Sequence, residues 1–565
     1  MPIREYHQRT RHLPDAYAAG PESLDWDAQP NPFRRYDGAR LVPLPLGATD
    51  LMARPDARRW EQLWQPSVGQ SSEAVVIPDL GQLGLLLELS LALSAWKQFG
   101  NAKWSLRVNP SSGNLHPTEC YLLVRSMAGL EDGVYHYRPD QHALELRCPL
   151  GLEEESPEPL LYLGLSSVHW REAWKYGERA YRYCQLDVGH ALAAVSFAAS
   201  TLGWHQHQIR PVALADSTLA SLLGLDRPQD LQQADGSMAE AEHPDCLLNL
   251  LANRHPDSAS AEEAEQITAW LGQQKEWMGR ANVLDPRHMY QWPVIDEVAA
   301  AARIPATSPA SATTRLAAAD WPAPAIASGS EARQPAARLI RQRRSAQAFD
   351  AAGGMALADF YTLLDHCLPR SDYSPWHTLP LSHGIQLMLF VHKVEGLPSG
   401  LYCLQRDTGR SLTDMQASLR AEFQWQPVES APEHLPFYRL LAAGTRRTAM
   451  RLSCQQAIAG ESAFSLAMLA DCDGMEAEPW RYRHLYWQAG AIGQVLYLEA
   501  EAAGLRGTGI GCYYDDMVHN LLGLQNDQQQ VLYHFTVGVP VIDHRITSWS
   551  AYGKASVEPS PPTGV

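Results

Sequence analysis

The pattern of apolar and polar positions occurs twice along the chain. The segments 121–137 (YLLVRSMAGLEDGVYHY) and 388–404 (MLFVHKVEGLPSGLYCL) align without a gap. Each predicts an apolar strand, a short connection and a second strand that begins at a glycine. The two segments therefore predict the same pair of strands in each half of the chain.

Two long apolar segments, 187–204 and 488–505, follow these strand pairs. In each segment two glycines stand 14 positions apart, Gly189 and Gly203 in the first and Gly490 and Gly504 in the second. A helix that is apolar around most of its circumference is buried on more than one face. Each could be the core helix of its own half, but the presence of two such helices favours their packing on each other.

The segments LLGLD (222–226) and LLGLQ (521–525) give a third match in the same order. Three ordered matches indicate an internal duplication. Between the halves lies an Ala/Pro/Ser-rich stretch with little periodicity, which is typical of a linker. We therefore expect a first domain at 1–285, a linker at 286–336 and a second domain at 337–565, arranged as an intramolecular pseudo-dimer.

The 565-residue chain is acidic, with 46 Lys and Arg residues against 63 Asp and Glu residues and a net charge of −17. This charge argues against nucleic-acid binding, because the phosphate backbone would be repelled. An anionic ligand must instead be held by a local cluster of cations. The cysteines form no CxxC pair, which predicts buried, reduced thiols and no zinc or other metal site. They are Cys120, Cys148, Cys184, Cys246, Cys367, Cys403, Cys454, Cys472 and Cys512.

The N-terminal residues MPIREYHQRTRH are charged and contain no apolar signal segment, so we expect a cytoplasmic protein. The most apolar run, LGQLGLLLELSLALSAW, is short and carries Glu88. It predicts a core helix rather than a membrane span, and we expect no membrane partner.

The first half carries a turn that the second half lacks. Extending the first gapless alignment backwards places HTLPL (377–381) opposite this turn. Retention of a turn in one copy only indicates a role beyond the fold. Five small or turn-forming residues make up the turn, directly before an apolar strand in RVNPSSGNLHPTECYLLVR: Pro110, Ser111, Ser112, Gly113 and Asn114.

The second half carries cations and glycines instead. Arg343 and Arg344 precede Ser345 near a predicted helix, and such a cluster either holds a phosphate or forms a solvated basic face. The glycines of GLRGTGIGCYYDD (504–516) either allow close backbone approach to a flat ligand or form an ordinary loop. Arg545 is a candidate second phosphate contact or a surface residue. The motifs are complementary, so one composite site between the halves would use both sets.

At these residues the sequence resembles the nitroreductase superfamily of FMN-dependent oxidoreductases, and within it the SagB-type (azoline) dehydrogenases. RRSAQAFD is similar to the family's Arg-x-Ser-x-Arg/Lys motif, and NPSSGNLHP is similar to its Pro-Ser-Ser-x-Asn segment. GTGIGCYYDD stands where the family contacts the flavin near N5. The resemblance implies an α+β fold with two nitroreductase-like domains, each a central, mostly antiparallel sheet flanked by helices. It also implies a pseudo-dimer with one intact FMN site.

The resemblance implies cofactor-binding roles in both halves. Arg343 and Ser345 would hold the phosphate region, with Arg344 and Arg545 nearby. Gln347 stands where the family usually has Arg or Lys, which removes one positive charge. The flavin ring would be lined by Pro110, Ser111, Ser112 and Asn114, and contacted near N5 by the backbone of Gly509, Ile510 and Gly511.

The segment KYGERAYRY resembles the context of a Lys-Tyr pair in SagB-type dehydrogenases, and Lys175 and Tyr176 match that pair. The implied chemistry is removal of a proton from a thiazoline or oxazoline ring and hydride transfer to N5 of FMN. Desolvation near a flavin would lower the pKa of Lys175 toward that of a base, and Tyr176 would donate or orient. Periodicity alone instead predicts an ordinary helix start with Lys175 in solvent.

Three functions are compatible with the sequence. The leading hypothesis is an FMN-dependent dehydrogenase of the SagB type that oxidises an azoline or related natural-product intermediate, delivered by a biosynthetic partner. The alternatives are an NAD(P)H-dependent nitro or quinone reductase and a flavin-free scaffold subunit. Arg179, Arg182 and His190 could shape the substrate pocket, unless Arg182 pairs with Asp187.

Overall fold

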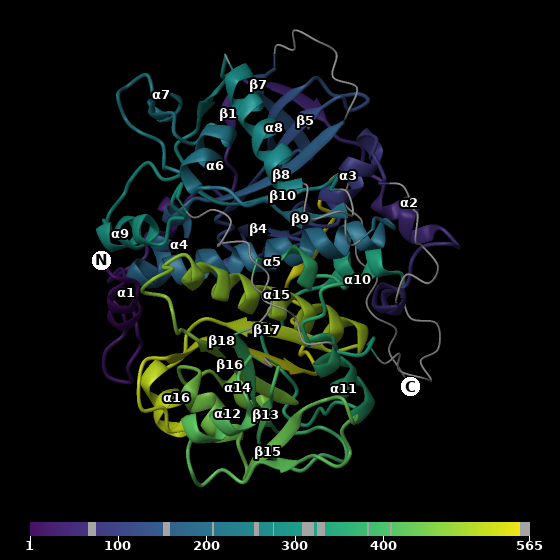
Figure 1. The fold of residues 1–565 in the computed structure, drawn as a ribbon, viewed down its shortest axis with the longest axis vertical. Coiled ribbons are helices and arrows are strands. Elements are labelled where there is room, and N and C mark those ends of the chain that lie inside the picture. The colour runs from purple at the N-terminus through teal and green to yellow at the C-terminus, as the bar shows by residue number, and fades with distance from the viewer. Residues whose placement is uncertain are drawn as a thin grey trace.

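The computed structural model consists of two sheet-and-helix halves joined through a pair of long helices (Figure 1). It describes residues 1–65, 75–150, 159–205, 208–252, 259–274, 276–307, 321–324, 334–380, 384–406 and 409–553. The helices of the first half are α1 (Ile3–Arg9), α2 (Ala48–Ala53), α3 (Leu80–Glu88), α4 (His169–Tyr176), α5 (Ala180–Thr201), α6 (Asp216–Leu223), α7 (Pro228–Leu231), α8 (Ala259–Gln273) and α9 (Pro293–Ala301). Those of the second half are α10 (Ala336–Gln342), α11 (Leu357–His366), α12 (Leu412–Ser418), α13 (Arg446–Leu452), α14 (Ala457–Glu461), α15 (Arg481–Ala502) and α16 (Asp515–Leu522).

Each half contains a sheet whose described residues form seven antiparallel strands. In the first half the order is β2 (Arg40–Pro43), β7 (Ala143–Pro149), β6 (Gly133–Arg138), β5 (Thr118–Arg125), β8 (Leu160–Ser167), β10 (His243–Asn249) and β9 (Arg210–Pro211). In the second it is β14 (Gln426–Pro427), β15 (Phe437–Ala442), β13 (Gly400–Leu404), β12 (Ile385–Val391), β16 (Phe464–Asp471), β18 (Gln529–Gly538) and β17 (Arg506–Ile510). The predicted α+β fold and internal duplication are confirmed by this shared order.

The central helices α5 and α15 pack along each other between the two sheets (Figure 1). Each has 22 residues, and the two glycines expected at equivalent positions meet at the crossing. A Cβ atom on Gly189 would lie 2.1 Å from the carbonyl oxygen of Trp487, and one on Gly490 would lie 2.2 Å from that of Leu186. The backbones therefore approach too closely for any side chain, and the predicted helix pairing is present.

The C-terminal part of the chain crosses to the first half. Strand β19 (Thr547–Trp549) pairs with β3 (Leu93–Phe99), which in turn pairs with β4 (Ala102–Arg107). The expectation of one continuous core helix over the apolar run around Glu88 is therefore wrong. The helix ends at Glu88, and the residues that follow form β3 because they pair with strands on both sides. A small separate ladder joins β1 (Tyr36–Asp37) and β11 (Arg280–Ala281).

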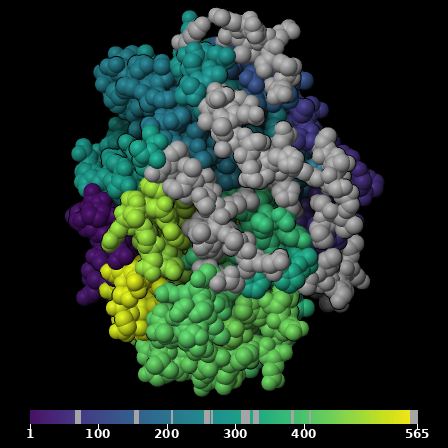
Figure 2. Space-filling view, viewed as in Figure 1, coloured from purple at the N-terminus to yellow at the C-terminus, as the bar shows by residue number. Residues whose placement is uncertain are grey.

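The N-terminal helix α1 makes the reciprocal crossing. His7 Nδ1 and Tyr482 Oη are 3.0 Å apart, and Arg11 Nη1 donates to Asp516 Oδ1 at 3.2 Å. Figure 2 shows N-terminal residues in purple beside the yellow surface of the C-terminal part of the chain. Each half thus extends one end of the chain over the other half, which ties the two together outside the central helices.

The expected linker at 286–336 begins with ordered structure. Helix α9 lies within it and buries Val294, Ile295 and Val298 against the main core. The Ala/Pro/Ser-rich residues at 308–320 and 325–333 lie outside the described residues. None of the helices formed by the described residues is both long and apolar enough to cross a lipid bilayer.

Candidate functional site

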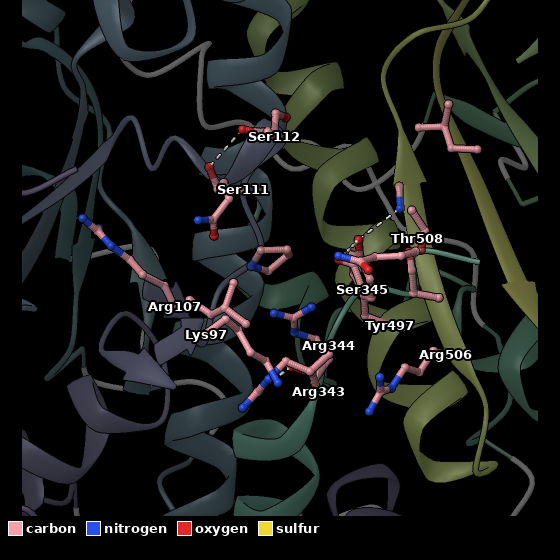
Figure 3. A pocket seen from close by; sticks show the side chains of 18 of the residues that line it. Lys97, Arg107, Ser111, Ser112, Arg343, Arg344, Ser345, Tyr497, Arg506 and Thr508 are labelled. Atoms are coloured by element: carbon pink, nitrogen blue, oxygen red, sulfur yellow. Dashed lines mark hydrogen bonds between the residues drawn. The ribbon is translucent and has the colours of Figure 1, made fainter. Parts of the chain in front are cut away.

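A cavity of about 810 Å³ lies between the two halves and is lined by residues of both. Its size falls within the range of small-molecule and cofactor sites. Figure 3 shows the serines of the first-half turn facing the arginines and Ser345 of the second half across this space. Of the residues proposed from sequence, those that line it are Pro110, Ser111, Ser112, Asn114, Tyr176, His190, Arg343, Arg344, Ser345, Gln347, Gly509, Ile510 and Gly511.

Four cations gather on one side of the cavity: Lys97, Arg343, Arg344 and Arg506 (Figure 3). Lys97 belongs to β3 of the first half, and Arg506 begins β17 of the second. Like charges repel one another unless an anion lies among them. The cluster therefore marks the side of the cavity that can bind an anionic group in a chain whose net charge is negative.

Arg343 is held in a fixed position and retains an unused donor. It is 5% exposed, its Nε donates to the carbonyl oxygen of Val108 at 3.3 Å, and its guanidinium lies 4.9 Å from the ring centroid of Tyr497. Nη1 is buried and has no hydrogen-bond partner among the described residues. Burial lowers the pKa of this guanidinium. A buried donor without a partner, in a cationic cavity, fits an oxygen of a phosphate.

The segment after α10 follows the edge strand β17. The amide of Ala346 donates to the carbonyl of Gly507 at 3.1 Å. The hydroxyl of Tyr497 lies 2.9 Å from Ser345 Oγ and accepts from the amide of Gly509 at 3.0 Å. Tyr497 thereby fixes the phosphate-motif serine and the glycine segment on one wall of the cavity.

The glycines of β17 and the following loop make room for tyrosines. A Cβ on Gly509 would lie 1.7 Å from Tyr533 Oη, and one on Gly511 would lie 2.2 Å from Tyr183 Cε1. Both tyrosines also line the cavity. The sequence suggested that these glycines let a flat ligand approach the backbone closely. In the described structure, tyrosine rings of both halves lie in this space.

The turn of the first half is a strained loop anchored by one carboxylate. Gly113 and Asn114 have φ angles of 58° and 60°, which place both in the left-handed region. Asp187 of α5 accepts from the Ser112 amide at 3.0 Å and from Ser112 Oγ at 3.0 Å. Ser111 Oγ accepts from the amide of His116 at 2.8 Å. These contacts hold the turn against the long helix.

Asp187 faces the cavity from a fully buried position. Burial raises its pKa to about 7, although hydrogen bonds from Ser111 and Ser112 partly oppose the rise. Close by, Glu172 is completely buried, and neither of its carboxyl oxygens has a partner among the described residues. Burial raises the pKa of Glu172 well above its usual range, and the charge of Asp187 adds to the rise. Both effects favour the neutral form of Glu172.

Tyr176 and Lys175 end helix α4, but they lie differently with respect to the cavity. Tyr176 lines it, and its hydroxyl would be 2.6 Å from a Cβ on Gly113. Lys175 does not line it, and its Nζ lies 5.8 Å from the ring centroid of Trp26 and 5.3 Å from that of Tyr176. The proposed catalytic pair therefore presents its tyrosine, rather than its lysine, to the cavity.

Three sequence candidates lie elsewhere. Arg545 does not line the cavity, and its Nη2 forms an ion pair with Asp543 at 2.8 Å on the surface. Arg179 and Arg182 each bind Asp515 at 3.0 Å and thereby join α5 to α16. Arg182 thus pairs with a carboxylate of the other half and not with Asp187, because residues distant in sequence meet at the interface.

Sequence reasoning missed several residues of the cavity. Arg506 lies within the quoted glycine-rich segment, so its charge beside the glycines was an available signal. Lys97 has no such signal, because its strand was taken as part of a helix. Tyr183 ends the quoted KYGERAYRY segment, whereas Tyr497 and Tyr533 reach the cavity through packing that no motif indicates. Within the described part of the chain, no group of three or more His, Cys, Asp or Glu side chains is placed to hold a metal ion.

The fold and cavity define a class of two-domain α+β protein with a ligand site shared between duplicated halves. Residues 340–539 match the family model described as the Nitroreductase family. The chain is similar to the solved structure of a nitroreductase-like protein of Anabaena variabilis, with a TM-score of 0.59 and 19% sequence identity. The superposition covers 95% of this chain and 99% of that protein. Residues 340–539 are therefore similar to the Nitroreductase family, and the chain as a whole shares the fold of the Anabaena variabilis protein.

Two curated relatives match shorter parts of the chain. A nitroreductase-like protein of Methanocaldococcus jannaschii is 32% identical over 108 residues, which cover 17% of this chain and 52% of the relative. The trifolitoxin-processing protein TfxB of Rhizobium leguminosarum bv. trifolii is 27% identical over 242 residues, which cover 40% of this chain and 60% of the relative. The chain thus spans between half and two thirds of the length of each.

Proposed function

We propose that the chain binds one FMN between its halves and is a SagB-type dehydrogenase acting on an azoline or related natural-product intermediate. The observation that carries this proposal is the composite cavity, with a cationic side and an aromatic, hydroxyl-bearing side, each of which contains residues of both halves. The similarity to TfxB, whose name describes the processing of trifolitoxin, supports a natural-product substrate. We further propose that this substrate derives from a peptide and is presented by a biosynthetic partner.

The cationic side fits the phosphate of FMN. Arg343 would direct its unpartnered Nη1 to a phosphate oxygen, with Arg344, Lys97 and Arg506 adding charge around it. Gln347 lines the same cavity and contributes no charge, so the compensating cations come from residues outside the family motif. A charge-assisted hydrogen bond of this kind contributes about 1.5–3 kcal/mol.

The opposite side would receive the flavin ring and substrate. Bound FMN supplies the hydride acceptor. The Ser112 turn, held by Asp187, would fix the ring, and Tyr176 would orient a substrate or donate to it from the end of α4. For Lys175 to remove the substrate proton, its Nζ must move from beside Trp26 toward the cavity past Tyr176.

The first test is the flavin content of the purified full-length chain. About one FMN per chain, with flavin absorbance, supports the proposal, whereas a colourless protein that takes up no added FMN supports the scaffold alternative. Flavin bleaching under anaerobic conditions on addition of a thiazoline-containing peptide, without a nicotinamide, supports the dehydrogenase. Bleaching by NAD(P)H with reoxidation by a nitro or quinone compound supports the reductase instead.

The second test concerns the Lys-Tyr pair. Lys175→Ala and Tyr176→Phe should retain FMN and lower the rate of azoline oxidation by about 100-fold or more, because general acid–base groups contribute about 10²–10⁴-fold. Lys103→Ala is the matched control, since Lys103 lies over the Trp96 ring and does not line the cavity. Unchanged turnover in Lys175→Ala would remove the base assignment and leave the flavin site intact.

A further inference from the structure

We propose that Cys454 and Cys512 form a redox-active dithiol at the edge of the cavity, which exchanges with low-molecular-weight thiols and disulfides. This inference is independent of the proposed dehydrogenase activity. No sequence pattern indicates the pair, because the two cysteines are far apart in the chain and belong to no CxxC motif.

The tertiary structure brings the two sulfur atoms into contact. Sγ of Cys454 and Sγ of Cys512 are 2.6 Å apart, close enough for one thiol to donate to the other. Cys454 follows the C-terminus of α13, and Cys512 follows the end of β17. The backbone fixes this meeting, because the amide of Tyr514 donates to the carbonyl of Leu452 at 2.9 Å. This hydrogen bond therefore limits how far the two sulfur atoms can move apart.

The backbone around Cys454 is itself unusual. Cys454 and Gln455 have φ angles of 51° and 61°, and neither is a glycine. Such conformations are energetically unfavourable for residues other than glycine and persist where the surroundings impose them. The side chain of Gln456 then reaches back, and its Nε2 donates to the carbonyl of Cys512 at 3.2 Å. The turn thus holds Cys454 against Cys512.

The surroundings distinguish the two thiols. A hydrogen bond with Cys454 lowers the pKa of Cys512 to about 5 against the opposing effect of burial, and a further hydrogen bond from His12 lowers it as well. His12 Nδ1 accepts from the amide of Ala18 at 3.0 Å, so the ring proton lies on Nε2, where it can be donated to sulfur. The same hydrogen bond raises the pKa of Cys454. In the proposed exchange, Cys512 is therefore the nucleophilic thiolate, and Cys454 is the thiol that resolves the mixed disulfide.

The pair is accessible to small molecules. Cys512 lines the cavity, and both cysteines are partly exposed, whereas Cys120, Cys184 and Cys472 are buried. A thiolate that is exposed and stabilised by nearby donors is the reactive form of cysteine. A resolving thiol already in contact makes a mixed disulfide short-lived, because the second attack is intramolecular.

The exchange balances with a disulfide as oxidant. The Cys512 thiolate attacks one sulfur of a low-molecular-weight disulfide such as oxidised glutathione, which forms a mixed disulfide and releases one thiolate. The sulfur of Cys454 then attacks Cys512, which forms the Cys454–Cys512 bond and releases the second thiol with the Cys454 proton. The two protein thiols lose two electrons, and the small disulfide gains them.

The test uses the full-length chain equilibrated in glutathione buffers of increasing oxidised fraction, quenched with N-ethylmaleimide. Digestion and mass spectrometry then locate the disulfides. We expect a peptide pair linked through Cys454 and Cys512, with the loss of two alkylated thiols and full recovery after a dithiol reductant. Wild-type protein that keeps both thiols alkylated in oxidised glutathione, or that links other cysteines, would overturn the proposal.

Single variants separate the two roles. Cys454→Ser should retain a glutathione adduct on Cys512, because no resolving thiol remains, whereas Cys512→Ser should lose both the adduct and the disulfide. Cys246→Ser is the control, since Cys246 is partly exposed in β10 of the first half and does not line the cavity. Circular dichroism establishes that each variant is folded. If a variant does not fold, the location of the disulfides in the wild-type protein still tests the proposal. Equal adduct formation in Cys512→Ser would contradict the assigned nucleophile.

Discussion

The carboxylate of Asp187 accepts hydrogen bonds from both the amide and the hydroxyl of Ser112, each at 3.0 Å. This relationship ties the long helix α5 to the turn that lines the cavity. Asp187 is buried, and its ionised form is stabilised by the Ser111 hydroxyl together with these two donors of Ser112. The geometry of the turn and the ionisation of Asp187 are therefore linked.

Asp187→Asn should change how stability depends on pH. In the unfolded chain Asp187 loses its proton near pH 4, whereas burial raises its pKa in the folded chain to about 7. Between these values the unfolded state binds fewer protons, so the contribution of Asp187 to the free energy of unfolding falls as pH rises from about 4 to about 7 and is constant above. Asparagine cannot ionise, so the variant should gain more than about 1 kcal/mol relative to wild type across this window. Urea unfolding at several pH values measures the difference, and parallel curves would contradict the assignment.

Arg343→Gln should weaken FMN binding about 10- to 100-fold and leave riboflavin binding nearly unchanged. The reason is that the variant removes the buried donor proposed to meet the phosphate, which riboflavin lacks. Titration of flavin-free protein with each compound provides the measurement. Arg545→Gln is the control, because Arg545 lies at the surface with Asp543 and should leave both affinities unchanged. Equal losses for FMN and riboflavin would show that Arg343 acts on the fold or the ring.

Gly189→Ala should destabilise the chain by about 1–3 kcal/mol or more, because overpacking against backbone cannot be relieved by a side-chain movement. The added Cβ would lie 2.1 Å from the carbonyl oxygen of Trp487 in α15. Gly272→Ala in α8 is the matched control, since its Cβ would meet nothing within 4 Å and alanine favours a helix over glycine by about 1 kcal/mol. Thermal unfolding compares the two variants, and an unchanged Tm for Gly189→Ala would contradict the close helix pairing.

His136→Gln should be most damaging at neutral and mildly acidic pH. His136 lies between Glu119 and Glu145, at 3.1 and 2.9 Å. Burial lowers its pKa, but hydrogen bonds to the two carboxylates outweigh burial and raise it to about 9. The stabilisation, on the order of 3 kcal/mol, is fully present below about pH 6.5 and is lost as pH rises through 9. Denaturation of both proteins from pH 6 to 10 tests this, and a constant difference would rule out a charged His136.

The duplication, the two strand pairs and the buried helices could all be predicted from the order of amino acids. Continuous apolar runs and helices that are apolar around most of their circumference indicate burial directly, because they show that more than one face avoids water. The sequence also placed the serine turn and the arginine cluster in different halves, which the shared cavity brings together. Local pattern failed at residues 93–96, where the apolar run predicted as a helix continues into β3.

Which side chains meet across the molecule became clear from the packed fold. Lys97 joins the arginines because β3 packs beside the second half, and Arg182 reaches Asp515 rather than Asp187 because α5 lies at the interface. The contact between Cys454 and Cys512 likewise depends on where α13 and β17 end in space. Sequence periodicity records the local choice between water and the core, whereas contacts between distant residues depend on the relative positions of packed elements, which no local pattern records.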